Sequence, residues 1–288
     1  MATSTLVLDT LLFVDTNVML DFYRIRKSDI STKYLEQLEL CKDRLIVGAQ
    51  VEMEYKKHRQ RVLVEFLAAS APPDWSKLTP PALIADLQAV KMIQKHRAQI
   101  MAHRKRVTEK IMKVLNDPTH HDPVYQTLQR LFKNSSPLNL RREREERFEI
   151  RELAEKRFKL GYPPRKSTDT SIGDAINWEW IVRCATDTGK HVVIVTRDTD
   201  YGVIFDGQSY LNDWLRQEFS ERVSHKRKII LTDKLSVGLK EVHAAVSREM
   251  EEEEARLLAR IKPADANEFP PVVEEFLNDL GAAADQGD

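Results

Sequence analysis

Four short, continuously apolar segments constrain the fold of this chain more than any other feature. They lie at residues 11–14, 44–47, 191–195 and 228–231, and the last three each begin with one polar residue, Arg44, His191 or Lys228. Continuous apolar runs of this length are typical of strands that are buried on both faces of a parallel sheet. Apolar residues at spacings of three and four predict helices at 31–40, 51–67, 172–185 and 234–261. The alternation of strands and helices predicts an α/β fold in three layers around a parallel sheet.

The middle of the chain departs from this alternation. Proline pairs at 72–73, 80–81 and 163–164 mark its limits. Between about 81 and 160 no run is typical of a strand, whereas 83–115, 124–132 and 138–160 have helical patterns. We therefore expect an all-helical insertion. The predicted parts are a first part of the α/β domain at 1–76, the insertion at 77–165, the second part at 166–240, and an acidic helix and tail at 241–288.

Acidic residues follow the predicted strands or lie early in the helices after them. Asp15 comes directly after the first strand, and Asp198 follows the strand at 191–195. Glu54 lies near the start of the helix after the second strand, and Asp174 opens the helix at 172–185. Because ligands of open α/β sheets bind at the carboxyl ends of the strands, we expect these four carboxylates to converge.

Four carboxylates in one small volume repel each other unless a cation neutralises them. Oxygen ligands without His or Cys favour the hard cations Mg²⁺ and Mn²⁺, which also bind phosphate oxygens. Two such ions about 4 Å apart could activate a water molecule and neutralise the leaving oxygen of a phosphodiester. The carboxylates therefore predict metal-dependent phosphodiester hydrolysis.

Several short motifs together resemble the PIN domain. They are Asp15-Thr16-Asn17 after an apolar strand, Glu54 within a helix, Gly173-Asp174 at a helix start, and the segment at 195–201. The matching stretches cover about half of the chain. The segment at 21–24 and the region of Arg59 resemble a longer PIN-like branch with helices inserted in mid-domain. The resemblance implies a sheet ordered 3-2-1-4-5 and an Mg²⁺- or Mn²⁺-dependent endoribonuclease.

Carried over to this chain, the resemblance makes Asp15, Glu54 and Asp174 metal ligands. Thr16, Asn17 and Thr196 would support them through side-chain hydrogen bonds. Asp198 is favoured as the fourth catalytic acid, and Asp200 is the alternative and a further candidate metal ligand. Glu52 is a rival to Glu54, but residues two positions apart on a helix face different sides, so only one of them can join the cluster.

The charge distribution indicates a nucleic-acid partner. The formal net charge is +0, but residues 241–288 hold 4 basic and 13 acidic residues, and residues 1–240 hold 41 basic and 32 acidic ones. The predicted helix at 91–113 holds eight Lys and Arg residues and one acid. We expect such a helix to bind phosphates, although a solvated helix face has the same composition. The candidate substrate-binding residues are Arg24, Arg59, Lys95, Arg104, Lys105 and Arg106.

Trp178 follows Asp174 by one helical turn, so it could stack on a base, although packing on the sheet is the favoured interpretation.

RNA is preferred over DNA as the substrate. The alternatives are a structure-specific DNA nuclease and a catalytically inactive PIN-like interaction module. The N-terminal sequence lacks a secretory pattern, which favours the cytoplasm, and we expect no membrane partner. Self-association stays open, and an antitoxin partner has little support because the chain is about twice as long as the small PIN toxins.

Overall fold

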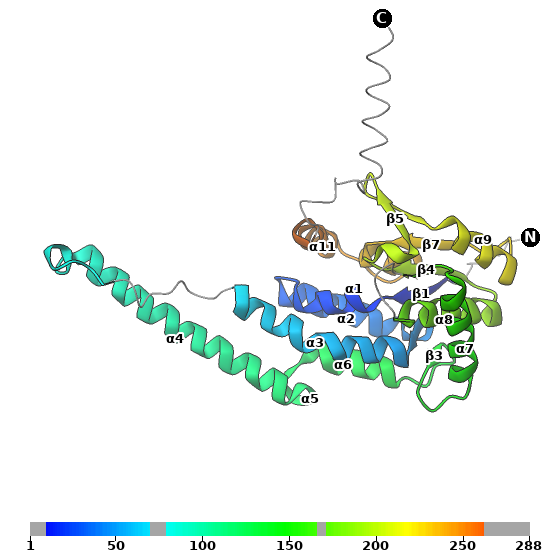
Figure 1. The fold of residues 1–288 in the computed structure, drawn as a ribbon, viewed down its shortest axis with the longest axis horizontal. Helices are drawn as coiled ribbons and strands as arrows, with labels where there is room; N and C mark the ends of the chain where they lie inside the picture. The colour runs from blue at the N-terminus through cyan, green and yellow to red at the C-terminus, as the bar shows by residue number, and fades with distance from the viewer. Residues whose placement is uncertain (1–9, 70–78, 166–170, 262–288) are drawn as a thin grey trace, which may run out of the picture.

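The computed structural model describes residues 10–69, 79–165 and 171–261. A five-stranded parallel sheet with the order β3-β2-β1-β4-β7 forms its centre (Figure 1). The strands are β1 (Thr10–Val14), β2 (Leu45–Gly48), β3 (Asn139–Leu140), β4 (His191–Val195) and β7 (Ile229–Thr232). Because β7 is the fifth strand of this sheet along the chain, the predicted order 3-2-1-4-5 is confirmed. The four apolar runs form four of its strands, with ends that differ from the prediction by one residue at most.

The central strand β1 shows why continuous apolar runs predicted this sheet. All five of its residues are buried, and it pairs in parallel with β2 on one side and with β4 on the other. Leu12 lies beside both Leu45 and Val193 in the register of the sheet. With helices on both faces, neither set of alternating side chains reaches water, so the four positions from Leu11 to Val14 are all apolar.

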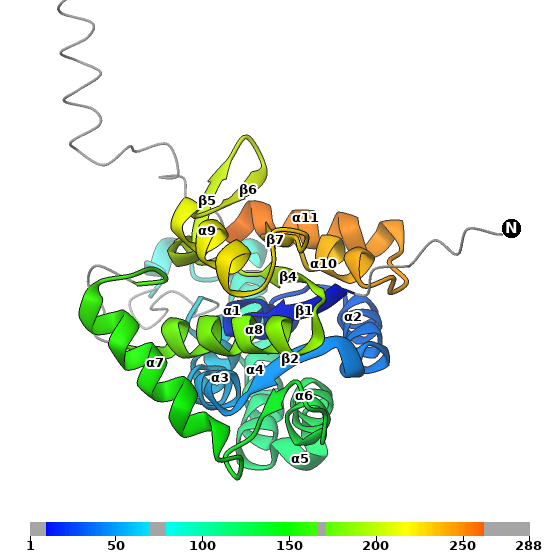
Figure 2. The same ribbon diagram turned by 90° about the vertical axis from the view of Figure 1, so that its right-hand side faces the viewer.

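Helices cover both faces of the sheet. Figure 2 shows α7 (Glu146–Leu160) and α8 (Gly173–Thr188) on one side, and α2 (Ser28–Leu40) and α10 (Leu235–Glu241) on the other. Helix α10 packs closely on the sheet, since a Cβ atom added at Gly238 would lie 2.4 Å from Val195 Cγ2. The remaining helices of the α/β body are α1 (Thr16–Leu20), α3 (Ala49–Ala69), α9 (Asp213–Arg222) and α11 (Arg248–Ile261).

The middle of the chain is only partly an insertion outside the sheet. Helix α4 (Gln88–Asn116) has no buried residue and extends away from the body (Figure 1). Helices α5 (Pro118–His121) and α6 (Pro123–Lys133) return to it, and α6 buries Leu128, Leu131 and Phe132 in the core. Strand β3 then joins the edge of the sheet beside β2. The expectation of an all-helical segment is therefore wrong at β3, because two residues are too few to produce a periodic pattern.

Two further features differ from the sequence-based prediction. The expected helix at 234–261 is two helices, α10 and α11, and between them His243 takes a positive φ of 59°. The hairpin of β5 (Gly202–Phe205) and β6 (Gln208–Leu211) was not predicted. Its turn is Asp206-Gly207, both with positive φ, which is a common hairpin signal. The short helix expected at 272–280 and the final residues 281–288 lie outside the described residues.

Within residues 10–69, 79–165 and 171–261, every helix is too short or too polar to cross a membrane. The division of the chain into the four predicted parts stays a prediction.

Candidate metal centre

Asp15 lies where the sequence predicted, at the carboxyl end of β1. It caps α1, because its Oδ1 accepts a hydrogen bond of 2.6 Å from the backbone N–H of Thr16. Its Oδ2 accepts from Thr196 Oγ1 at 2.6 Å and from Asn17 Nδ2 at 3.0 Å. Thr196 directly follows β4. The three predicted supporting residues therefore fix the Asp15 carboxylate between the ends of two neighbouring strands.

The environment of Asp15 is unfavourable for an isolated charge. Its side chain is buried, and this burial is the main reason that the pKa of Asp15 is raised from 3.8 to about 7. The hydrogen bond from Thr196 lowers the pKa, but the nearby charges of Asp198 and Glu54 raise it further. A cation next to Asp15 would favour the ionised carboxylate and offset this cost.

Glu54 approaches Asp15 from α3. Its Oε2 accepts a hydrogen bond from Thr16 Oγ1 at 3.2 Å, and its Oε1 accepts one from Gln50 Nε2 at 2.5 Å. The start of α8 lies directly against this pair. A Cβ atom added at Gly173 would lie 2.3 Å from Glu54 Oε1 and 2.7 Å from Gln50 Nε2. Glycine is thus the residue that lets Glu54 reach the first turn of α8.

Glu52, the rival of Glu54, has a different partner. Its Oε1 forms an ion pair of 2.6 Å with Lys56 Nζ, one turn further along α3. Only Glu54 contacts the residues around Asp15, as the two-residue spacing on a helix predicts.

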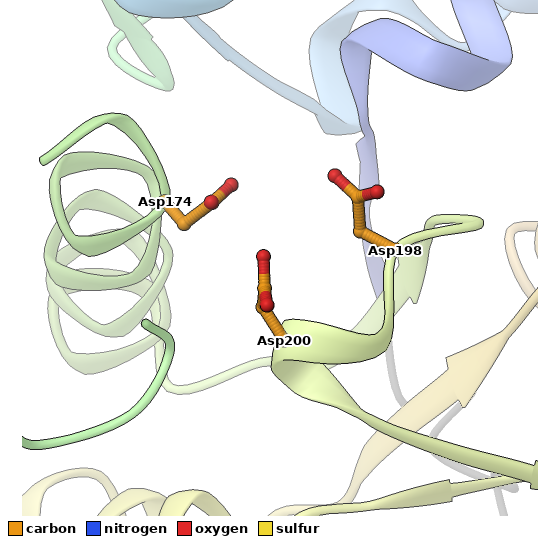
Figure 3. Close-up of side chains that lie close together, drawn as sticks. All are labelled: Asp174, Asp198 and Asp200. Carbon is orange, nitrogen blue, oxygen red and sulfur yellow. The ribbon is translucent and has the colours of Figure 1, made fainter. Parts of the chain in front are cut away.

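Three other carboxylates form a tight group. One oxygen from each of Asp174, Asp198 and Asp200 can be chosen so that all three lie within 4.8 Å of one another. Figure 3 shows the three side chains pointing toward a common point, Asp174 from α8 and the other two from the segment after β4. The N–H of Asp198 donates to Thr196 Oγ1 at 3.0 Å, so the same threonine positions Asp15 and Asp198.

The structure therefore modifies the expected arrangement of the acids. Asp200, the alternative to Asp198, lies in the same group as Asp198, so the two do not exclude each other. Asp15 and Glu54 lie outside this group of three, although the charges of Asp198 and Glu54 are both close enough to Asp15 to raise its pKa. The acids thus form a tight group of three and a neighbouring pair, in which Asp15 is buried and Glu54 is half-buried.

Tyr201 is a residue of this site whose role the sequence did not indicate. It is fully buried in the short 3-10 helix at Thr199–Tyr201, and its hydroxyl donates to the backbone oxygen of Asp174 at 3.3 Å. Burial and then the charges of the surrounding acids, Asp174 first, raise the pKa of Tyr201 well above its usual value. Tyr201 therefore remains a neutral phenol that ties the segment after β4 to the start of α8.

The chemistry of the donors fits a hard cation. The five acids offer carboxylate oxygens alone, without sulfur or imidazole nitrogen, and Asp174, Asp198 and Asp200 are only half-buried. Such a set suits Mg²⁺ or Mn²⁺, which bind few protein oxygens and keep water molecules for the remaining positions. A half-buried group leaves room for those waters and for a substrate oxygen.

One of the candidate substrate contacts, Arg59, is wrong, and the favoured interpretation of Trp178 as a core residue is confirmed. Arg59 is 4% exposed and donates to Asp122 Oδ2 at 2.5 Å, so its guanidinium is not accessible to a phosphate. The sequence could not show this, because Asp122 lies 63 residues further along the chain. Trp178 is 0% exposed, so it packs in the core and does not stack on a base. Arg24 pairs with Asp21 and Glu65 but remains partly exposed.

The candidate phosphate contacts of the middle region lie on α4. Lys95, Lys105 and Arg106 are exposed, whereas Arg104 is half-buried and donates to the backbone oxygen of Leu67 in α3 at 3.1 Å. Arg104 therefore holds the second half of α4 against α3. The other three remain candidates for contact with a polyanion.

Comparison with known proteins gives one family. The model of the PIN domain matches residues 12–201, which is more than half of the 288-residue chain and includes all five acids of the site. No curated protein and no solved structure matched the chain. The matched range, the strand order and the acidic residues at the ends of β1 and β4 agree with one another, and the chain belongs to the PIN domain family, whose fold is of the nuclease type.

Proposed function

We propose that this protein is an Mg²⁺- or Mn²⁺-dependent endoribonuclease. The observation that carries the proposal is the group of Asp174, Asp198 and Asp200, whose carboxylate oxygens lie within 4.8 Å at the carboxyl edge of the sheet. The neighbouring pair of Asp15 and Glu54 adds two further acids. Such a concentration of negative charge is costly without a cation.

All five acids would take part in binding the metal. Asp174, Asp198 and Asp200 would hold one ion, and Asp15 with Glu54 would complete the site or help to hold a second one. Bound there, the metal supplies positive charge that promotes deprotonation of a water molecule and neutralises the scissile phosphate. Thr196 keeps Asp15 and Asp198 oriented through two hydrogen bonds, and Tyr201 holds the start of α8 in place.

The substrate is expected to be RNA, with DNA as the alternative. The exposed cations Lys95, Lys105 and Arg106 on α4 would bind its backbone, and Arg24 remains a further candidate.

A catalytically inactive module is a weaker explanation, because all five candidate ligands are present. A cytoplasmic location and the capacity for self-association stay predictions from the sequence.

Cleavage assays test this proposal. Single-stranded RNA and DNA of the same sequence would be incubated with the protein in Mn²⁺ and in EDTA. We expect RNA to be cut in Mn²⁺ only, and Asp174→Asn to abolish the cut because the amide loses the charge. Asp187→Asn is the matched control, since Asp187 lies on α8 but pairs with Arg183. Cleavage of DNA alone would reassign the substrate, and equal cleavage by Asp174→Asn would reject the site.

A further inference from the structure

A pocket next to the metal centre is lined mostly by residues other than those described above for the metal site. It lies between the ends of β2 and β3, the start of α3, and helices α7 and α8, and its volume is about 450 Å³. Cavities of this size hold small organic ligands. Gln50 joins the pocket to the metal centre, because it lines the pocket and also donates to Glu54 Oε1.

The inner wall of the pocket is apolar. Met53, Leu140, Ile176 and Trp180 line it. Trp180 is 4% exposed, and its indole N–H donates to the backbone oxygens of Val47 at 3.0 Å and Leu138 at 3.1 Å. These bonds fix the ring at the edge of the sheet. Trp180 is thus a fixed part of an apolar wall, which suits a flat, partly apolar group such as a nucleobase.

The rim of the pocket is cationic. Arg142, Arg147 and Arg151 line it, and all three are exposed. The guanidinium of Arg147 lies 4.5 Å from the ring centre of Phe148, which also lines the pocket. Among the described residues that line the pocket, none is acidic. Arg151 Nε also pairs with Glu155 Oε1 at 3.0 Å, so Arg142 and Arg147 supply most of the positive charge of the rim. A pocket whose lining holds arginines and no carboxylate favours an anionic ligand, and arginine is well suited to phosphate.

Asn177 provides a separate indication of a ligand. It lines the pocket, is only 4% exposed, and its Nδ2 has no hydrogen-bond partner within the described part of the chain. A buried amide donor without a partner costs free energy, so an acceptor on a bound ligand would stabilise the site. Asn177 follows Asp174 by three residues on α8, so the two side chains lie on neighbouring parts of one helix face.

We infer that this pocket binds one nucleotide of the substrate, adjacent to the phosphate at the metal centre. The base lies against the apolar wall and accepts a hydrogen bond from Asn177, and a phosphate contacts the arginines of the rim. Phe148 offers an aromatic surface for stacking, which tolerates any base. This inference rests on the proposed nuclease function, because it assigns the pocket to the same substrate.

Binding of a mononucleotide tests the inference without metal and without cleavage. Adenosine 5′-monophosphate would be titrated into the full-length protein in EDTA and followed by saturation-transfer NMR, with inorganic phosphate in a parallel series. We expect saturable binding of the nucleotide, weaker binding of phosphate, and at least about a tenfold loss of nucleotide affinity in the double variant Arg147→Glu, Arg151→Glu, because contacts to charged groups are removed.

Two further variants make the result specific. Met53→Trp, at a position 40% exposed, fills the pocket from the apolar side and should also weaken nucleotide binding. Lys156→Glu is the control, since Lys156 is exposed on α7 but does not line this pocket. Equal binding of phosphate and nucleotide, or equal affinity in wild type and the pocket variants, would overturn the inference. A protein that binds the nucleotide but cuts no nucleic acid would instead contradict the proposed nuclease function.

Discussion

At the scale of single residues, Gly173 controls how closely α8 approaches Glu54. An added Cβ atom would lie 2.3 Å from Glu54 Oε1. This distance is too short for two atoms that are not bonded, so one of them would have to move. The atoms it would meet are the ends of two flexible side chains, Glu54 and Gln50, which can move away at little cost to the fold. The same movement would take the Glu54 carboxylate out of its place beside Asp15.

We therefore predict that Gly173→Ala separates stability from metal binding. The melting temperature in EDTA should change little, because alanine is also a better helix former than glycine. The affinity for Mn²⁺ should fall by roughly tenfold or more, as is typical when groups that position metal ligands are disturbed. Calorimetric titration and thermal unfolding measure the two quantities. An unchanged Mn²⁺ affinity would show that Glu54 is not needed for the metal site.

At the scale of elements, a buried ion pair joins helices that are distant in sequence. Arg59 of α3 donates to Asp122 at the start of α6 and to the backbone oxygen of Val114 at the end of α4. The hydroxyl of Tyr23 also donates to Asp122 Oδ2 at 2.7 Å. Asp122 is thus the acceptor on which this junction depends, and its role is structural.

Asp122→Ala should destabilise the protein by roughly 3–5 kcal/mol, because the Arg59 charge would stay buried without its partner. Denaturation in urea measures this loss. Nucleic-acid affinity of the folded variant should equal that of the wild type. If the variant is as stable as the wild type, Arg59 is not held in a structural ion pair and is again a candidate substrate contact, as the sequence had suggested.

The elements also show what a sequence of this kind can reveal. Strands β1 and β4 were predictable because the residues of a strand that is covered on both faces are apolar at successive positions, as they are from Leu11 to Val14 and from Val192 to Val195. Their position then predicted that Asp15 and Asp198 converge. Strand β3 has two residues, and its pairing with β2 depends on a return of the chain after α6, which no local pattern encodes. For the same reason the Arg59–Asp122 pair and the pocket between α7 and α8 were not foreseen.

At the scale of the whole molecule, the extended helix α4 places cations outside the α/β body. Its exposed Lys95, Lys105 and Arg106 lie on a helix with no buried residue (Figure 1). If they contact phosphates, each contact releases counterions from the nucleic acid. Neutralising all three should then lower the slope of log affinity against log salt by up to about two for single-stranded RNA.

The salt series would use Asp174→Asn as the background, so that the RNA stays intact. A matched control neutralises Lys42, Lys226 and Lys228, which are exposed near the starts of β2 and β7, at the opposite edge of the sheet from the acids. The control should leave the slope unchanged. Equal slopes for the α4 variant and the wild type would mean that α4 does not contact the nucleic acid.

The central claim is that the carboxylates at the carboxyl edge of the sheet bind a divalent metal. Calorimetric titration of the metal-free protein with Mn²⁺ tests it most directly, with Asp174→Asn as the site variant and Asp187→Asn as the control on the same helix. We predict saturable Mn²⁺ binding to the wild type and the control, and its loss in Asp174→Asn. Absence of Mn²⁺ binding to the wild type, or equal binding by Asp174→Asn, would contradict the account.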